Sequence, residues 1–190
     1  MTKKLNLKLL ALLFALFAFT ACDDDDDIIP EEENEEEVIT TVKLTFTDES
    51  DVETVFTWAD PENDGSPVID DITLESGKTY ELSVQLLNET ESPAEDITEE
   101  VEEEGVDHQF FFSGTAIDDL ITISYNDSDE DGNPVGLDNN VTILATGGPS
   151  VLTVILRHQP DKSATGVSDG EIDNAGGETD VSVDFNITVQ

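Results

Sequence analysis

Hydrophobic and polar residues alternate with a period of two over much of the chain from Val38 onward. The C-terminal segment shows this most clearly, because Val181, Val183, Phe185 and Ile187 share one face and polar residues occupy the other. Such alternation is typical of half-buried β-strands. The same pattern predicts further strands at residues 38–47, 53–59, 80–86, 107–113, 120–126, 140–145 and 151–158.

The order of these segments predicts the fold class. No helical pattern of 10–15 residues separates the strands, so parallel crossover connections are not expected. The only helix candidate is 94–104, where Ala94, Ile97 and Val101 form a narrow apolar stripe, and a loop is the alternative there. We therefore predict an all-β protein, an antiparallel β-sandwich with an immunoglobulin- or fibronectin-like architecture.

The predicted domain, residues 38–190, contains an internal repeat. Residues 56–68 align without gaps on residues 123–135, and residues 82–86 align on residues 152–156. We interpret this as a duplicated unit, with copies at about 53–119 and 120–190, which form either one sandwich or two small tandem sandwiches. Trp58 and Tyr125 occupy matching positions and are expected to anchor the core.

The N-terminal segment differs in composition from the predicted domain. Lys3, Lys4 and Lys8 precede the apolar run 9–21, which ends at Ala21 directly before Cys22, the only cysteine of the chain. This arrangement predicts a lipoprotein signal peptide at 1–21 and lipidation of Cys22, hence membrane attachment through a lipid anchor. The apolar run is too short to span a bilayer about 30 Å thick. With one cysteine, no intramolecular disulfide can form.

Acidic residues dominate the segment after Cys22. Residues 22–37 (CDDDDDIIPEEENEEE) lack a periodic apolar pattern and predict an extended, solvated tether. The chain as a whole has a formal net charge of −39, which excludes nucleic acid as a partner.

The run Cys22–Asp27 resembles the surface lipoproteins of Bacteroidetes, in which acidic residues after the lipidated cysteine act as an export signal. The resemblance implies an outer-membrane lipoprotein at the cell surface or on the periplasmic face. A competing precedent comes from enteric bacteria, where an aspartate after the cysteine retains lipoproteins in the inner membrane.

Further segments resemble small acidic flavobacterial lipoproteins: Leu87–Glu95, Glu99–Glu104 with His108–Phe112, and Asn174–Asp180. Such proteins tend to carry a label that names the type 1 periplasmic binding fold, a two-lobed α/β architecture of roughly twice this length. The two-residue periodicity and the lack of crossover helices favour the all-β prediction instead.

Two acidic loops at matching positions of the repeat suggest calcium. Alternate oxygen-bearing side chains and a glycine at the sharp turn can surround a hard cation. The second loop offers Asp127, Asp129, Asp131 and Asp138, and the first offers Asp60, Glu62, Asp64 and Asp71. The alternative interpretation is an ordinary Asp-Gly turn between strands.

His108 and His158 are the other candidate ligands. Each follows the parity of the core residues in its strand and lies at a strand end, so the two could meet at one rim of the sandwich. With a carboxylate such as Asp107 or Asp161 they could hold zinc or copper, or they could ligate haem iron. Structural histidines that form hydrogen bonds at strand ends are the alternative.

The sequence predicts a protein that is not an enzyme, because it contains no G-x-S-x-G or H-E-x-x-H motif and Cys22 is committed to lipid. Two functions remain. The first is a calcium-stabilised, lipid-anchored sandwich that binds another envelope component. The second is a metal or haem capture module, using His108 and His158, that serves an outer-membrane TonB-dependent transporter.

Overall fold

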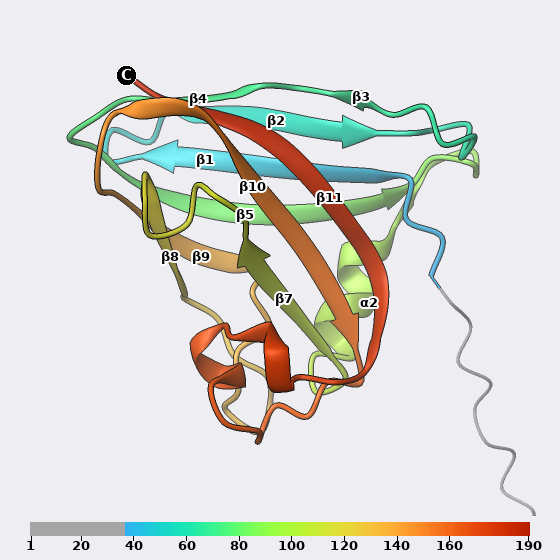
Figure 1. Cartoon of the computed structure of the whole chain (residues 1–190). Helices are drawn as coiled ribbons and strands as arrows, with labels where there is room; N and C mark the ends of the chain where they lie inside the picture. The colour runs from blue at the N-terminus through green and yellow to red at the C-terminus, as the bar shows by residue number, and fades with distance from the viewer. Residues whose placement is uncertain (1–36) are drawn as a thin grey trace, which may run out of the picture. The chain divides into compact units, whose positions relative to one another are not determined.

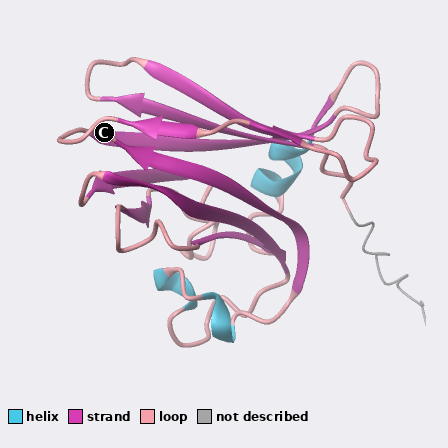
Figure 2. Ribbon diagram, turned by 45° about the horizontal axis from the view of Figure 1, so that its top comes forward, coloured by secondary structure: helices cyan, strands magenta, loops and turns pink. Residues whose placement is uncertain are grey.

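The computed structural model describes residues 37–190, whose strands form two sheets packed face to face (Figures 1 and 2). The predicted signal peptide, the lipidation site Cys22 and all of the predicted acidic tether except Glu37 lie outside the described residues. The all-β sandwich predicted from the alternation is therefore confirmed for the described part of the chain.

The first sheet follows the order β3-β2-β1-β5-β9-β8, and β6 pairs with β5 off this path. All its described pairs are antiparallel. Its strands are β1 (Thr41–Asp48), β2 (Glu53–Ala59), β3 (Val68–Ile69), β5 (Thr79–Asn88), β6 (Glu95–Asp96), β8 (Ile121–Tyr125) and β9 (Asp138–Ile143).

The second sheet has the order β4-β11-β10-β7. Its strands are β4 (Ile72–Leu74), β7 (His108–Ser113), β10 (Gly147–His158) and β11 (Glu178–Val189). One described pair in this sheet departs from the antiparallel arrangement, because β4 pairs with β11 in parallel. After β3, at the edge of the first sheet, the chain passes to the second sheet at residues 70–71, and β4 then lies beside the C-terminal strand β11. These segments are too short to show a periodic pattern in the sequence.

The core lies between the sheets and consists of the residues that the alternation marks as apolar. Val42, Leu44 and Phe46 of β1 are completely buried, and they face Leu152, Val154, Leu156, Val183, Phe185 and Ile187 of the second sheet within the same cluster. Phe46 meets the rings of Phe56 and Tyr80 edge to face, at centroid distances of 5.8 and 6.1 Å. Trp58 is only partly buried against this core.

The two predicted repeat units share these sheets. The aligned strands β2 and β8 both lie in the first sheet, but the aligned strands β5 and β10 lie in different sheets. The internal duplication therefore stays a prediction.

Helices are short in the described chain. The candidate at 94–104 forms α2 (Ile97–Glu103), which is capped by Asp96 and buries Ile97 and Val101 against the core. Two 3₁₀ turns, η1 (Val167–Asp169) and η2 (Ile172–Asn174), lie in the excursion between β10 and β11. There, Val167 and Ala175 surround Phe111 in a second small core.

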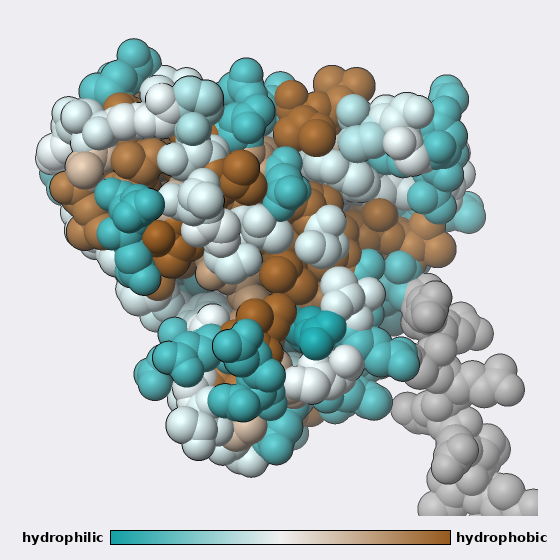
Figure 3. All heavy atoms as spheres, in the orientation of Figure 1, coloured by the Kyte–Doolittle hydropathy of each residue, from teal (hydrophilic) through white to brown (hydrophobic). Residues whose placement is uncertain are grey.

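Among the described residues, no helix is long and apolar enough to cross a membrane. Hydrophobic residues on the face seen in Figure 3 stand between polar ones. Several large apolar side chains are exposed, among them Val68 and Ile69 of the edge strand β3.

We predict that Phe46→Ala lowers the free energy of unfolding by about 3–5 kcal/mol, because it removes a fully buried ring between two aromatic neighbours. The matched control is Val55→Ala, since Val55 is 50% exposed on the adjacent strand; its loss should stay below about 1 kcal/mol. Urea unfolding measures both. Equal losses would contradict the position of the core.

Candidate metal centre

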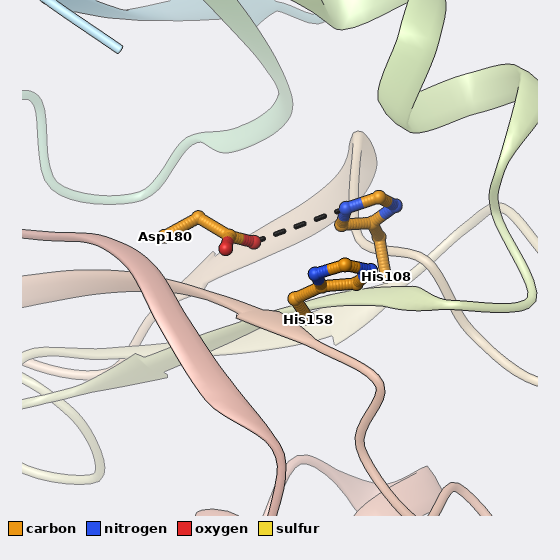
Figure 4. Close-up of side chains that lie close together, drawn as sticks. All are labelled: His108, His158 and Asp180. Carbon is orange, nitrogen blue, oxygen red and sulfur yellow. Dashed lines mark ion pairs between the residues drawn. The ribbon is translucent and has the colours of Figure 1, made fainter. Parts of the chain in front are cut away.

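His108 and His158 meet at one end of the second sheet, as the strand-end parity predicted. They face each other across the β7–β10 ladder, and their rings stack with centroids 4.8 Å apart at an interplanar angle of 11°. Asp180 of β11 points at the same place (Figure 4). One ligand atom from each of these three residues lies within 4.8 Å of the others.

The tautomer of His108 follows from its surroundings. Its Nδ1–H donates a hydrogen bond to the backbone carbonyl of Glu104, 3.2 Å away, because a carbonyl can only accept. In the neutral ring, Nε2 therefore carries a lone pair. Burial lowers the pKa of His108 below its ordinary value, which favours this neutral form. A backbone carbonyl that fixes one ring nitrogen is the usual support of a metal-binding histidine.

Two carboxylates face the lone pair of His108. Asp180 Oδ2 lies 3.8 Å from His108 Nε2, and Glu37 Oε1 lies 3.5 Å from it. All three side chains are at least nine-tenths buried. A lone pair and two carboxylates repel one another when all are unprotonated, so this arrangement favours a bound cation.

The surroundings of Glu37 disfavour the charged form of its side chain. Burial, followed by repulsion from Asp180, Glu100 and Glu104, raises its pKa to about 7. Its Oε2 atom is buried and has no hydrogen-bond partner. A bound ion or a water molecule could satisfy such a buried acceptor.

A β-bulge brings Asp180 into the cluster. The β10–β11 register shifts between Leu156 and Arg157, whose partners are Val181 and Thr179, so Asp180 is the extra residue. Strict alternation would place Asp180 with the outward-facing Ser182 and Asp184; a bulge re-aims a side chain in this way. The periodic pattern does not reveal such an insertion, and the sequence reasoning missed Asp180.

The acids named from sequence as partners of the histidines lie elsewhere. Asp107 is exposed. Its backbone carbonyl accepts a hydrogen bond from the N–H of Gln159. The Asp161 carboxylate accepts hydrogen bonds from Ser163. Among the described residues, neither belongs to a group that could hold a metal.

The observed distances suit a small ion. With metal–ligand bonds of about 2.0–2.1 Å, neighbouring ligand atoms of a tetrahedral zinc lie about 3.3 Å apart. Within the group of His108, His158 and Asp180, the separation of 3.8 Å between Asp180 Oδ2 and His108 Nε2 is somewhat longer than that value. Haem fits less well, because two axial imidazoles lie on opposite faces of the porphyrin, whereas these rings stack directly on each other.

The acidic loops form no such cluster among the described residues. In the second loop, the Asp127 carboxylate accepts hydrogen bonds from the backbone N–H groups of Gly136, Leu137 and Asp138. In the first loop, Asp60 accepts from the N–H groups of Asp64 and Gly65.

The outer members of the loops are also separated. Asp71 accepts from Asn186 of the second sheet, while Glu62 and Asp131 are exposed. Both loops thus contain Asp-Gly turns, and the calcium hypothesis from the sequence has no gathered set of ligands among the described residues to support it.

The side chain of Lys162 places a positive charge against the second loop. The Lys162 ammonium donates to Asp129 Oδ2 at 2.9 Å, to the Pro134 carbonyl at 3.0 Å and to the Gly105 carbonyl. The side chains of Lys162 and Asp129 are 5% and 1% exposed. Burial alone would raise the pKa of Asp129, but the hydrogen bonds from Lys162 and the Asn133 N–H hold it below its ordinary value. The sequence reasoning missed this role of Lys162.

Comparison with known proteins reveals no relative of this chain. No protein-family model matches the chain, and neither a curated protein nor a solved structure matches it significantly.

We predict that Lys162→Met destabilises the protein by about 3–5 kcal/mol, because it leaves the buried Asp129 carboxylate without its cation. The matched control is Lys78→Met, which removes an ion pair with Asp48 whose lysine is 37% exposed; its loss should be much smaller. Chemical unfolding at neutral pH measures both variants. Similar losses would show that the Lys162 pair is no stronger than a surface pair.

We also predict that millimolar calcium leaves the melting temperature unchanged relative to chelator, because the loop carboxylates already accept backbone N–H groups or the Lys162 ammonium. The control is the double variant Asp127→Ala with Asp131→Ala, which should show the same absence of a shift. A calcium-dependent rise of several degrees that the double variant abolishes would instead support the calcium hypothesis.

Proposed function

We propose that this protein is a non-catalytic, lipid-anchored envelope protein whose sandwich binds a divalent transition metal, zinc or copper, at His108, His158 and Asp180. The observation that carries the proposal is the His108 ring. Its Nδ1–H is held by the Glu104 carbonyl, and its Nε2 faces buried carboxylates 3.5 and 3.8 Å away. Two imidazoles and a carboxylate are the ligand types that zinc and copper prefer.

The accessibility of the cluster supports capture rather than a purely structural ion. His108 is buried, whereas His158 is partly exposed and gives an ion a route from solvent. A binding site at the rim of a lipid-anchored domain would suit a module that collects metal and presents it to another envelope component, such as a TonB-dependent transporter. The lipid anchor and this partner rest on the sequence.

Zinc binding tests the proposal. Metal-free full-length protein in detergent should take up one equivalent of zinc in a calorimetric titration at about 0.15 M salt. Millimolar calcium is added so that nonspecific binding to the acidic surface is saturated. His108→Gln and His158→Gln should each abolish this binding, because each removes a nitrogen ligand.

The controls are Asp107→Asn and Asp161→Asn, which remove acids near the histidines that lie outside the cluster. Both should bind zinc as the wild type does. If zinc binding survives both histidine substitutions, the ion is held by surface carboxylates and the proposed site is wrong.

A further inference from the structure

The strand β8 ends the first sheet and β7 ends the second, and residues of both edge strands line one cleft of about 310 Å³. Its walls include Phe112 of β7 and Tyr125 of β8, whose ring centroids lie 6.5 Å apart, and Ile123 of β8. No lysine or arginine of the described chain lines the cleft, whereas three exposed acids do: Asp118, Asp169 and Glu171. The cleft therefore combines aromatic and aliphatic walls with negative charge.

The backbone of Ile123 is available on the cleft side of β8. After β8, the Asn126 N–H donates to the Asp138 carbonyl of β9. Before β8, the Leu120 carbonyl accepts from the Leu144 N–H. Hydrogen bonds alternate along an antiparallel pair, so the even-numbered residues of β8 bond toward β9 and Ile123 directs its N–H and carbonyl away from β9. On that side the described chain pairs only with the first residue of β8.

The backbone of Phe112 is available in the same way on β7. The Phe110 N–H donates to the Val135 carbonyl, and the Phe110 carbonyl accepts from the Tyr125 hydroxyl, both at 2.7 Å. These groups point away from β10, so by the same alternation Phe112 directs its N–H and carbonyl to the open side. In the described chain β7 has no other partner strand than β10. The cleft thus lies between two strand edges, and an open edge is a template for an added strand.

Gly170 leaves space in the cleft next to Tyr125. It has a φ of +93°, and a Cβ atom at this position would lie 3.3 Å from the Tyr125 hydroxyl oxygen. A larger side chain there would narrow the cleft, in a backbone conformation that favours glycine. The Tyr125 hydroxyl is itself fixed, because Gln109 Nε2 donates to it at 3.3 Å and it donates to the Phe110 carbonyl. The cleft is therefore largely pre-formed, as binding sites usually are.

The chemistry of the lining identifies the occupant. We propose that the cleft binds an extended segment of a basic partner protein, whose backbone pairs with Ile123 and whose lysine or arginine side chain enters beside Phe112 and Tyr125. The apolar stem of this side chain packs on the rings, and its charged head meets the three acids. A volume of about 310 Å³ is at the lower end of the range of ligand pockets, which suits one side chain better than a large ligand.

The charge of the chain argues against a second copy as the occupant. Two chains with a formal net charge of −39 repel each other, whereas a basic segment is attracted. This inference goes beyond the proposed metal site and does not rest on it, because none of the residues that line the cleft belongs to the histidine cluster.

A synthetic peptide, acetyl-Thr-Val-Arg-Val-Thr-amide, tests the cleft on the full chain in detergent at about 0.15 M salt. At millimolar peptide, residue-resolved NMR should show changed amide signals for Phe112 and Ile123 and slower amide hydrogen exchange at Ile123. A peptide with glutamate in place of arginine should not bind, because the acids of the cleft repel it. A peptide methylated at every backbone nitrogen keeps its charge but cannot donate to a strand, and it should not bind either.

Matched triple variants separate the cleft from the overall charge. Neutralising its acids, by Asp118→Asn, Asp169→Asn and Glu171→Gln together, should weaken peptide binding about tenfold or more. The control neutralises three exposed acids outside the cleft, by Asp119→Asn, Asp173→Asn and Glu130→Gln together, and should weaken binding less than about threefold. Unchanged melting temperatures would verify that both variants fold.

Three results would overturn the inference. Equal weakening by the two triple variants would assign the binding to net charge, and full binding of the methylated peptide would exclude strand pairing. A wild type that does not bind the arginine peptide would leave the cleft without its proposed occupant. Zinc uptake is measured separately, and both triple variants should bind zinc as the wild type does, because they keep the histidine cluster. Failure of the peptide to bind therefore leaves the metal proposal intact.

Discussion

The burial of one apolar face of each sheet against the other is the constraint on which the rest of this structure depends. Among the described residues no disulfide is possible, so the interlocking of β1 and β5 with β10 and β11 must hold the fold. This packing runs almost the full length of β11 and ends where Asp180 is bulged out of register. The candidate metal centre begins at that point, where the apolar core gives way to buried polar residues.

Charge is the second constraint, and the chain handles it differently at two places. The described residues contain four cationic side chains of lysine and arginine, and one of them, Lys162, is placed inside to neutralise a buried carboxylate. At the rim of the second sheet, buried carboxylates instead face imidazole rings. Nearby positive charge would stabilise the buried carboxylates at both sites. In the second acidic loop a lysine of the chain provides that charge, whereas at the rim the carboxylates face histidine rings.

Much of the fold could be predicted from the sequence because its signals are local. Alternation predicted the long strands and the inward faces of Leu44 and Phe185, and a narrow apolar stripe predicted α2. The short strands β3, β4 and β6 were not predicted, since a segment of two or three residues shows no periodic pattern.

The candidate site was predictable in part. The parity of His108 and His158 with core residues indicated that they could meet. The contribution of Asp180 depends on a bulge, and Glu37 lies at the end of the predicted acidic tether, outside the predicted strands; neither leaves a periodic trace. The acidic loops show a different limit of the sequence, because a motif-like spacing of carboxylates does not reveal the backbone N–H groups and the distant lysine from which some of these carboxylates accept hydrogen bonds.

The enclosure of Lys162 has a consequence for the chemistry of the folded surface. An amine that donates to three oxygens and is 5% exposed cannot act as a nucleophile, whereas Lys43 and Lys78 remain within reach of solvent. Acylating reagents should therefore modify these two lysines in the native protein and reach Lys162 only when the loop between β8 and β9 opens. The rate at which Lys162 is acylated would therefore report the local opening of that loop.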